Sequence, residues 1–345
     1  MTVLPRAPSR ALGVFVSPGG RVLRPVAKGA AMKRLLFALV LALPMLAGCA
    51  RPPTRLTIGV RNANDHVPFF LADDLGYYQS AGLQADVRIF PSNTELVEAA
   101  RRGEVQLGAV PAPSAVAAIA HGAPLVIVAM TGRGSDALLV RADSGITDLA
   151  GLRGRRVGTI RGSILDLLLR QSLQAAGMDA DRDVQIEYFS QLGDMLTALR
   201  SGQIDAASHT EPFLTQAEQE GWGRILLYYT HDWPDHPCCV VFARRDLVER
   251  QPELVEQVLR IHARAVDLAV ADPLAAARAI GSRMKGFDLA VIQASLAPDK
   301  MRIDDHLEAR EIERLAEAMY AQGLIERLPG RDEMLDLRFL ERLGR

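Results

Sequence analysis

Short apolar segments alternate with helical patterns over most of this chain, and this alternation constrains the fold more than any other feature. The segments with the length and composition of buried strands are Leu56–Val60, Ala85–Phe90, Val105–Val110, Leu125–Ala129, Ala137–Val140, Arg156–Ile160, Val184–Phe189, Ile204–Ala207, Ile225–Tyr228 and Cys238–Phe242. Most gaps between them are long enough for a helix and carry apolar residues at helical spacing. The pattern predicts an α/β protein with mainly parallel sheets flanked by helices.

The C-terminal third has a different pattern. No strand is expected after Asp246, and two apolar stripes recur at helical spacing. One stripe is formed by Val255, Val258, Leu259, His262, Val266 and Ala269, and the other by Ile312, Leu315, Ala316 and Met319. Gly323 is placed to end the second helix. The sequence therefore predicts a helical C-terminal region.

The N-terminus has the features of an export signal. The first 49 residues contain seven Lys or Arg and no acidic residue. Lys33 and Arg34 lead into the uncharged run Leu35–Leu46, which is shorter than the ~20 residues of a membrane-spanning helix. The following Leu46-Ala47-Gly48-Cys49 resembles a bacterial lipobox, in which the cysteine thiol is acylated. We expect a signal peptide at 32–48, with 1–31 a misassigned or disordered lead, and a lipid anchor on Cys49 in the cell envelope.

Removal of that segment leaves an acidic chain. The remaining part holds 33 Lys and Arg against 41 Asp and Glu, a net charge of −8 with His neutral. Scattered charge of this sign, without a basic stripe, does not suit a nucleic-acid partner. The length after Cys49 exceeds that of a typical single domain of ~100–200 residues and suits two lobes.

Two adjacent cysteines, Cys238 and Cys239, remain once Cys49 is acylated. A vicinal disulfide is uncommon because bridges prefer Cα atoms ~5.5 Å apart. A metal site could use His236 with both thiols, but adjacent side chains on a strand point to opposite faces. We therefore expect two small apolar strand residues, and neither a metal nor a cofactor.

Several stretches in a fixed order resemble one family. They are Val67–Tyr78, Ala81–Leu83, Glu95–Gly108, Gly122–Val128, Asp143–Gly158, Ala198–Ala206 and Glu211–Phe213. They resemble the type II periplasmic solute-binding proteins of the nitrate, sulfonate and taurine group, which also includes binders of thiamine-pyrimidine precursors. The resemblance covers about 56–280. It implies a monomeric binding protein that delivers a small solute to ABC permease and ATPase subunits.

The resemblance also implies two lobes connected by two crossings. We expect the crossings near Asp143–Leu152 and Tyr229–His236, which gives lobe 1 as 55–143 plus 236–345 and lobe 2 as 144–235. Ala137–Val140 and Cys238–Phe242 would then pair side by side. An interlobe cleft would hold a small polar or anionic organic solute, either sulfonate-like or pyrimidine-like.

Ligands of open α/β sheets bind at the carboxyl ends of strands, against helix N-termini. The candidate residues at these places are Asn62, Asn64, His66, Asn93, Thr94, Pro113, Ser114, Thr131, Arg161, Gly162, Ser163, His209, Glu211, Trp233 and His236. Arg161 is the predicted clamp for an anionic group. Asn93, Thr94 and Ser163 have the alternative role of capping the helices they precede. Arg161 has the alternative of a solvated charge, and Glu211 that of an acid favoured at a helix start.

Two other functions stay open at the level of sequence. The same fold includes an enzyme that makes the thiamine pyrimidine, with several cysteines near the final strand and a sacrificial histidine after the third strand of lobe 1. This chain has Cys238 and Cys239 only, and its matching loop Pro111–Ser114 has no histidine. No catalytic triad order, HExxH or phosphate-binding loop is present in the sequence. We therefore expect no enzymatic activity. The other alternative is a ligand-sensing lipoprotein without a transporter.

Overall fold

The computed structural model describes residues 54–345. The expected lead, the signal segment and Cys49 lie outside the described residues. The chain from Pro53 onward forms one compact unit. Among the described helices, none combines the length and the apolar character required to cross a bilayer.

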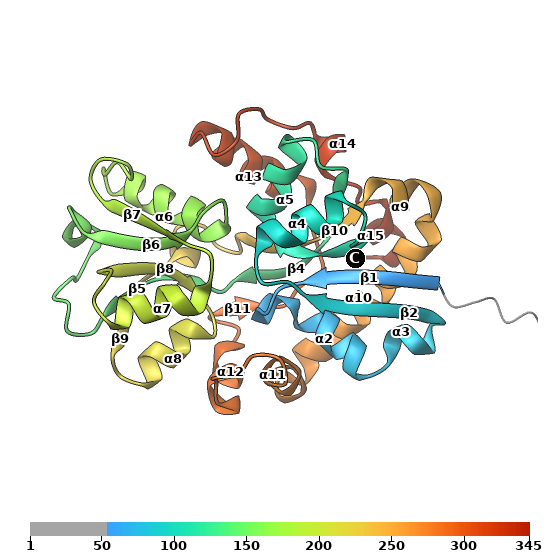
Figure 1. Cartoon of the computed structure of the whole chain (residues 1–345), viewed down its shortest axis with the longest axis horizontal. Coiled ribbons are helices and arrows are strands. Elements are labelled where there is room, and N and C mark those ends of the chain that lie inside the picture. Colours follow the sequence, from blue (N-terminus) through green and yellow to red (C-terminus); the bar gives the residue numbers. More distant parts are fainter. Residues whose placement is uncertain (1–53) are drawn as a thin grey trace, which may run out of the picture. The chain divides into compact units, whose positions relative to one another are not determined.

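Two separate sheets organise this unit (Figure 1). The first has the strand order β11-β4-β10-β3-β1-β2. Its strands are β1 (Thr54–Val60), β2 (Leu83–Ile89), β3 (Leu107–Pro111), β4 (Leu125–Gly134), β10 (Pro237–Arg244) and β11 (Met301–Arg302). The second has the order β7-β6-β8-β5-β9. Its strands are β5 (Asp136–Arg141), β6 (Arg156–Ile160), β7 (Gln185–Phe189), β8 (Ala206–Thr210) and β9 (Gly223–Tyr228). We call the elements around the first sheet lobe 1 and those around the second lobe 2.

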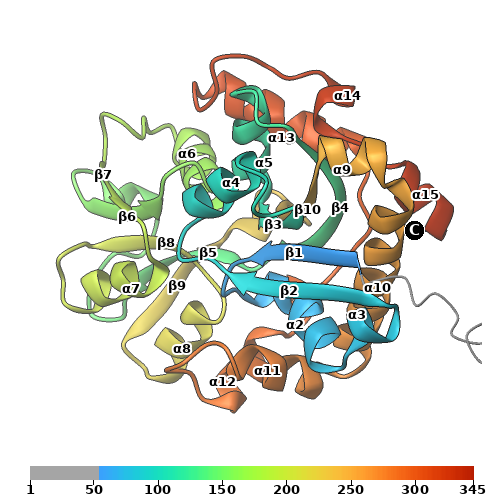
Figure 2. The ribbon, with the colours of Figure 1, turned by 45° about the vertical axis from the view of Figure 1, so that its right-hand side comes forward.

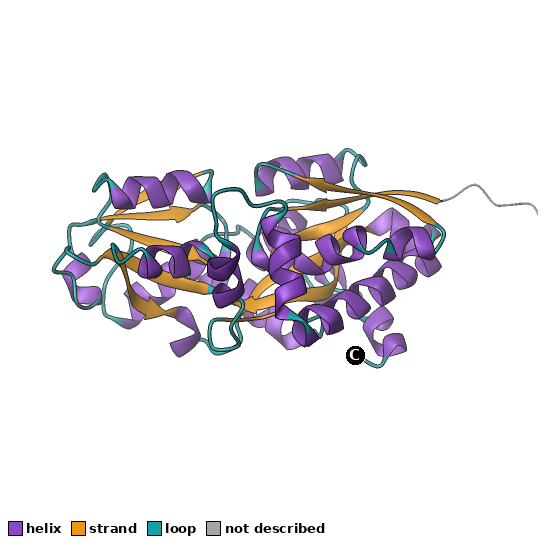
Figure 3. Ribbon diagram, turned by 90° about the horizontal axis from the view of Figure 1, so that it is seen from below, coloured by secondary structure: helices purple, strands orange, loops and turns teal. Residues whose placement is uncertain are grey.

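Helices flank both sheets (Figure 3). Those that belong to lobe 1 are η2 (Asn64–His66), α2 (Val67–Asp74), α3 (Tyr77–Ser80), α4 (Asn93–Arg101), α5 (Ala112–Ala120), α9 (Arg245–Arg250), α10 (Pro252–Ala271), α11 (Pro273–Gly281), α12 (Leu289–Ser295), α13 (Ala309–Ala321), α14 (Arg331–Met334) and α15 (Arg338–Leu343). Those that belong to lobe 2 are η3 (Leu149–Leu152), α6 (Ile164–Ala175), α7 (Leu192–Arg200) and α8 (Phe213–Gln219), while η4 (Tyr229–His231) lies on the second connection between the lobes.

The helical C-terminal region returns to lobe 1. Helix α13 packs on α5, and α15 packs on α10, which itself contacts α2 (Figure 2). The apolar stripes of α10 and α13 are buried, as their spacing predicts. The short strand β11, which pairs with β4, was not predicted, because two residues carry no periodic signal.

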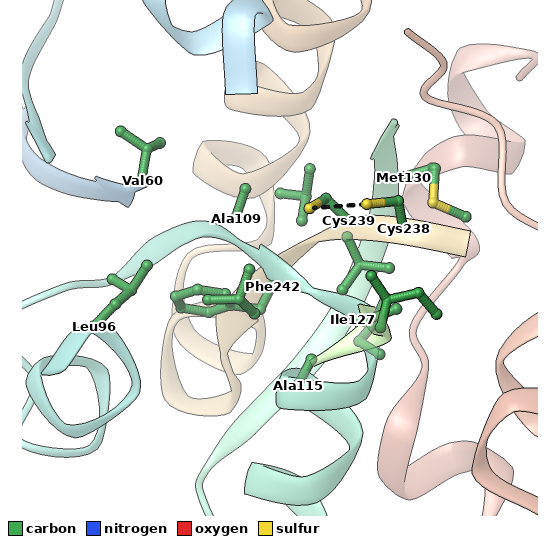
Figure 4. Close-up of a cluster of buried hydrophobic side chains, with 14 of the residues drawn as sticks. Val60, Leu96, Ala109, Ala115, Ile127, Met130, Cys238, Cys239 and Phe242 are labelled. Carbon is green, nitrogen blue, oxygen red and sulfur yellow. Dashed lines mark hydrogen bonds between the residues drawn. The ribbon is translucent and has the colours of Figure 1, made fainter. Parts of the chain in front are cut away.

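The core of lobe 1 lies between its sheet and the covering helices. Ala109 of β3, Ile127 of β4 and Phe242 of β10 meet Ala115 of α5 in one buried cluster (Figure 4). Close approach of β1 and β3 requires glycine, because a Cβ at Gly108 would lie 2.1 Å from the Gly59 carbonyl oxygen. The two-lobed α/β architecture agrees with the prediction from the sequence.

The strand directions differ from the prediction of mainly parallel sheets. Strands β1, β2 and β3 run parallel, as do β6, β7 and β8, but β10 runs antiparallel to β3 and β4. Strand β5 runs antiparallel to β8 and β9. The sheets are mixed because β5 and β10 enter them directly from the connections between the lobes, without a crossover helix.

The predicted pairing of Ala137–Val140 with Cys238–Phe242 is wrong. Residues 136–141 pair within lobe 2, and β10 pairs with β3 and β4. The chain therefore leaves the first sheet at Ser135, before the expected crossing at Asp143–Leu152. The error arose because the two glycines of Thr131–Gly134 predict a loop at this position, whereas strand β4 extends as far as Gly134.

Candidate functional site

A cavity of about 70 Å³ lies where the strand ends of the two lobes meet. Its lobe 1 wall is formed by Arg61, Asn62, Ala63, Asp65, His66, Asn93, Pro111, Cys238 and Cys239. Its lobe 2 wall is formed by Asp136, Ile160, Ser163, Ile164, Leu165, Leu192 and Thr210. Because both lobes supply walls, a solute in this cavity would contact both of them. Crevices at strand ends are where open α/β sheets bind their ligands.

Asp65 is a buried carboxyl group on the lobe 1 wall. It lies in η2, directly after the loop that follows β1, and its side chain packs on Gly132 of β4. A Cβ at Gly132 would lie 2.2 Å from Asp65 Oδ1, so glycine is required there. Burial, with a contribution from the nearby charge of Asp136, raises the pKa of Asp65 to about 7. Asp65 thus changes charge near neutral pH.

Asp136 opens β5 on the lobe 2 wall and is also buried. Its Oδ2 lies 3.0 Å from Nε2 of His236. The other ring nitrogen of His236, Nδ1, lies 3.1 Å from the carbonyl oxygen of Trp233 and donates to it. His236 therefore supports the Asp136 side chain from behind the cavity wall.

The expectation that Cys238 and Cys239 point to opposite faces of β10 is wrong. Both side chains line the cavity, and their sulfur atoms lie 3.8 Å apart (Figure 4). The pairing of β10 with β4 shifts register at this point, as in a β-bulge, so the usual alternation of side chains is lost.

The thiols of Cys238 and Cys239 lie close to the Asp65 carboxyl group and not to the His236 ring. Cys238 donates to Asp65 Oδ2 over 3.8 Å, and the three residues place one ligand atom each within 4.8 Å of the others. These donor types suit a borderline metal such as Zn²⁺. The metal group considered from the sequence used His236, whose ring nitrogens instead face Asp136 and Trp233.

Both thiols hold their protons at neutral pH. The hydrogen bond with Cys239, together with burial, raises the pKa of Cys238 well above its ordinary value. The same hydrogen bond favours the thiolate of Cys239, but burial together with the nearby charges of Asp65 and Asp136 outweighs it, and the pKa rises to about 11. A protonated, buried thiol is a poor nucleophile.

His66 places a neutral imidazole on the lobe 1 wall. Its Nδ1 accepts the backbone N–H of Arg61 over 2.7 Å, and burial lowers the pKa of the ring to about 3. The ring proton therefore sits on Nε2, which has no hydrogen-bond partner within the described chain. His66 thus offers the site one unused donor.

Arg61 is the cation of the lobe 1 wall. It follows β1, is partly buried, and has its pKa lowered by loss of solvent. It also borders a second hollow of about 480 Å³, whose lining shares Arg61, Asn62 and Leu192 with that of the inner cavity. We call this hollow the outer groove. Its other lining residues are Ile89, Phe90, Pro91, Gln191, Gly193, Phe213, Met284, Lys285 and Phe287.

Four of the predicted site residues line the inner cavity: Asn62, His66, Asn93 and Ser163. Ser163 has both roles considered for it, because its hydroxyl also accepts from the Leu165 backbone N–H and caps α6. Helix α4 is capped by Ser92, whose hydroxyl accepts from the Glu95 N–H, and not by Asn93 or Thr94. Thr94 is exposed outside both hollows.

Other predicted residues of lobe 1 lie behind the wall. Asn64 donates to the hydroxyl of Ser295, and the Thr131 hydroxyl donates to the Asp65 carbonyl oxygen, so each fixes η2 rather than facing the cavity. Pro113 is buried in α5. The hydroxyl of Ser114 donates to the Gly162 carbonyl oxygen over 3.1 Å, which joins the two lobes beside the cavity.

The predicted anion clamp, Arg161, does not line either hollow. Its guanidinium carbon lies 3.6 Å from the centre of the Tyr188 ring, and its side chain is exposed. Stacking on an aromatic face competes with the inward direction expected from the strand end. Arg61, in the lobe opposite, is the arginine that the fold brings to the site.

The remaining lobe 2 and connection residues also lie outside the inner cavity. His209 is buried against the Leu192 carbonyl oxygen, and burial lowers its pKa to about 4. Glu211 accepts from the Thr215 N–H at the start of α8. Trp233 lines a separate hollow beneath Arg314.

Sequence reasoning missed Arg61, Asp65, Asp136 and both cysteines as wall residues. Asp65 stands in the loop that was selected, so its charge was an available signal. Asp136 was missed because a polar residue directly before an apolar run is usually interpreted as the boundary of the strand and not as part of a site. The cysteines were excluded by a regular alternation that the irregular pairing of β10 breaks.

Comparison with known proteins agrees with this arrangement. The two lobes with a cavity between their strand ends define the class of periplasmic-type binding-protein folds. A family model described as the NMT1-like family matches residues 49–283, and the chain belongs to this family. The family resemblance drawn from the sequence is thereby confirmed.

A protein of Brucella abortus (strain 2308) that is named as a binding protein is 30% identical over 205 residues, 59% of this chain and 63% of the relative. The match thus spans less than two thirds of the relative's length. The solved structure of the periplasmic aliphatic sulphonate binding protein SsuA from Escherichia coli has a TM-score of 0.70 at 23% identity, covering 82% of this chain and 92% of that one. The periplasmic nitrate-binding protein NrtA from Synechocystis PCC 6803 gives 0.75 at 15% identity, covering 84% and 88%. These structures confirm the fold.

Proposed function

We propose that this protein is the solute-binding component of an ABC importer, acting outside the cytoplasm as a lipid-anchored monomer. It captures a small polar or anionic organic solute between its lobes and presents it to permease and ATPase subunits. The observation that supports this most directly is the inner cavity, which is walled by strand ends of both lobes. A ligand there can stabilise a closed form that a permease distinguishes from the empty one.

Arg61 supports the polar or anionic character of the solute. Its guanidinium is already partly desolvated by burial. An anionic group that pairs with it therefore displaces less water than it would at an exposed arginine. Asn93 lines the same cavity and its amide can donate a hydrogen bond, whereas the amide nitrogen of Asn62 already donates to the Arg283 carbonyl oxygen. The names of the solved relatives, which include sulphonate and nitrate binders, are consistent with this choice.

The protonation of the cysteines argues against the enzyme alternative. Thiol-dependent chemistry requires a lowered thiol pKa, and both cavity thiols have raised values. The loop Pro111–Ser114, which would carry a sacrificial histidine in the pyrimidine-forming enzyme, places Pro111 at the cavity wall.

A thermal-shift screen of the purified protein against a library of small solutes tests the proposal. A solute at a hundredfold excess over its Kd should stabilise the protein by ~2.7 kcal/mol. The library should include sulfonates, nitrate, pyrimidines, amino acids and aromatic acids. Turnover of a bound solute, or the absence of any stabilising solute across these classes, would contradict a binding-protein role.

A further inference from the structure

The inner cavity contains unused hydrogen-bonding atoms of mainly one kind. Among residues 54–345, the fully buried side-chain atoms without a partner that belong to cavity-lining residues are Asn62 Oδ1, Asp65 Oδ1, His66 Nε2 and Asp136 Oδ1. Three of these are acceptors, and two of the acceptors belong to buried carboxyl groups. Buried polar atoms are costly when they stay unpaired, so the occupant must supply donors.

The size of the cavity limits the part of the ligand that it takes. A volume of about 70 Å³ exceeds the ~10–15 Å³ required by one water molecule and has room for a head group of a few heavy atoms. Asp65 and Asp136 lie on opposite lobes, so a planar or tetrahedral nitrogen head with several N–H groups can reach both.

The outer groove has a different character. Its walls include Phe90, Phe213, Met284 and Phe287, and the rings of Phe213 and Phe287 meet edge to face with centres 4.9 Å apart. Ile89, another lining residue, is 41% exposed and adds apolar surface to the groove. The groove adjoins the inner cavity at Arg61, Asn62 and Leu192, which line both hollows.

We infer that the solute is an amphipathic molecule with an N–H-rich head, an amine or amidine, and an apolar, aromatic-sized tail. The head binds between Asp65 and Asp136 in the inner cavity, and the tail lies in the outer groove against Phe213 and Phe287. Any anionic substituent sits between the two, at Arg61. This inference rests on the proposed function and specifies its substrate class.

Three small probes separate the contributions. Benzamidine has an N–H-rich head and a ring, benzoate has the same ring with an acceptor-only head, and acetamidine has the head without the ring. Binding to the purified full chain is measured by calorimetry with a chelator present, which removes metal ions from the thiols. Benzamidine should bind with a Kd in the millimolar range. Benzoate and acetamidine should each have a Kd at least about tenfold higher.

Variants of the two hollows test which of them binds the amidine head and which binds the ring. Asp65→Asn should weaken benzamidine about tenfold to a hundredfold, because the acceptor loses its charge. Phe287→Ala should weaken benzamidine but leave acetamidine unchanged. Glu211→Gln is the matched control for Asp65→Asn, since burial likewise raises the pKa of Glu211 to about 7 but its carboxyl lies outside both hollows. Leu328→Ala, at an exposed apolar site, is the control for Phe287→Ala.

A measurement on the wild-type chain guards against a folding defect in Asp65→Asn. Bound benzamidine should shift the side-chain carboxyl ¹³C resonances of both Asp65 and Asp136 in the wild-type chain. Benzoate binding as tightly as benzamidine, no binding of benzamidine at millimolar concentration, or unchanged carboxyl resonances of Asp65 and Asp136 would each overturn the inference. If the library screen then finds a solute without N–H donors, the binding-protein role stands and the proposed substrate class alone fails.

Discussion

Asp136 and His236 join the two connections between the lobes through a hydrogen bond of 3.0 Å between Asp136 Oδ2 and His236 Nε2. Asp136 stands directly after the first connection, and His236 ends the second, 100 residues later. Both side chains are almost fully buried. The pair therefore ties the two connections to each other between the lobes.

Removal of one partner should be strongly destabilising. His236→Ala leaves the buried Asp136 carboxyl group without its hydrogen-bond partner, and we expect a loss of about 1–3 kcal/mol in the free energy of unfolding. Urea denaturation measures it. The control is His231→Ala, because His231 and Asp232 form a comparable pair on the surface, where we expect less than about 1 kcal/mol. Similar losses for the two variants would contradict the structural role of the buried pair.

Asp65 should make stability depend on pH in a defined direction. Its pKa is about 7 in the folded chain against 3.8 ordinarily. Between these values the folded state keeps the proton that the unfolded state has lost. The free energy of unfolding should thus fall as pH rises from about 4 to about 7, by at most about 4 kcal/mol.

The Asp65→Asn variant should lack this part of the fall. Unfolding of wild type and variant at several pH values provides the comparison. Parallel profiles for the two proteins would show that Asp65 titrates normally. Glu211→Gln should flatten the profile as well, because its raised pKa has the same sign.

The two arginines considered for the anionic group should differ. Arg61→Ala should weaken an anionic solute about tenfold to a hundredfold, since a contact with a desolvated charge is lost. Arg161→Ala should change binding little, because its guanidinium stacks on Tyr188. Calorimetry with one confirmed solute measures both, and a larger effect at Arg161 would restore it as the clamp.

Ligand binding should close the lobes. Ser135 and Asp235, on the two connections, have positive φ angles of 74° and 54°, a conformation that non-glycine residues rarely adopt. Small-angle scattering with and without a confirmed solute should show a smaller radius of gyration in the bound form. An unchanged radius with intact affinity would exclude a closing motion.

The lipid anchor is tested separately, because Cys49 lies outside the described residues. Cys49→Ala should abolish incorporation of labelled palmitate and leave the precursor uncut. Ala50→Ser, which leaves the cysteine in place, serves as the control. Palmitate labelling that persists in Cys49→Ala would refute the anchor.

The sequence alone determined the elements and the family. Apolar runs with period-2 or 3.6-residue spacing follow from which faces are buried, and they located β6 at Arg156–Ile160 with its exact bounds. Loops at strand ends could be chosen without knowing the fold, because parallel strands place their carboxyl ends together. This reasoning found Asn62, His66, Asn93 and Ser163.

Only the tertiary structure determined which ionisable side chains lie close together in the inner cavity. Asp65 and Asp136 are 71 positions apart and face one cavity only because β5 joins the second sheet and Gly132 admits the Asp65 side chain. The irregular pairing of β10 turns both thiols to the same side, and Tyr188 holds Arg161 away from the cavity. The spacing of apolar residues along a helix or strand indicates which face of that segment is buried. The chemistry of the site depends on distances between segments, and these are set by packing that a single sequence does not display.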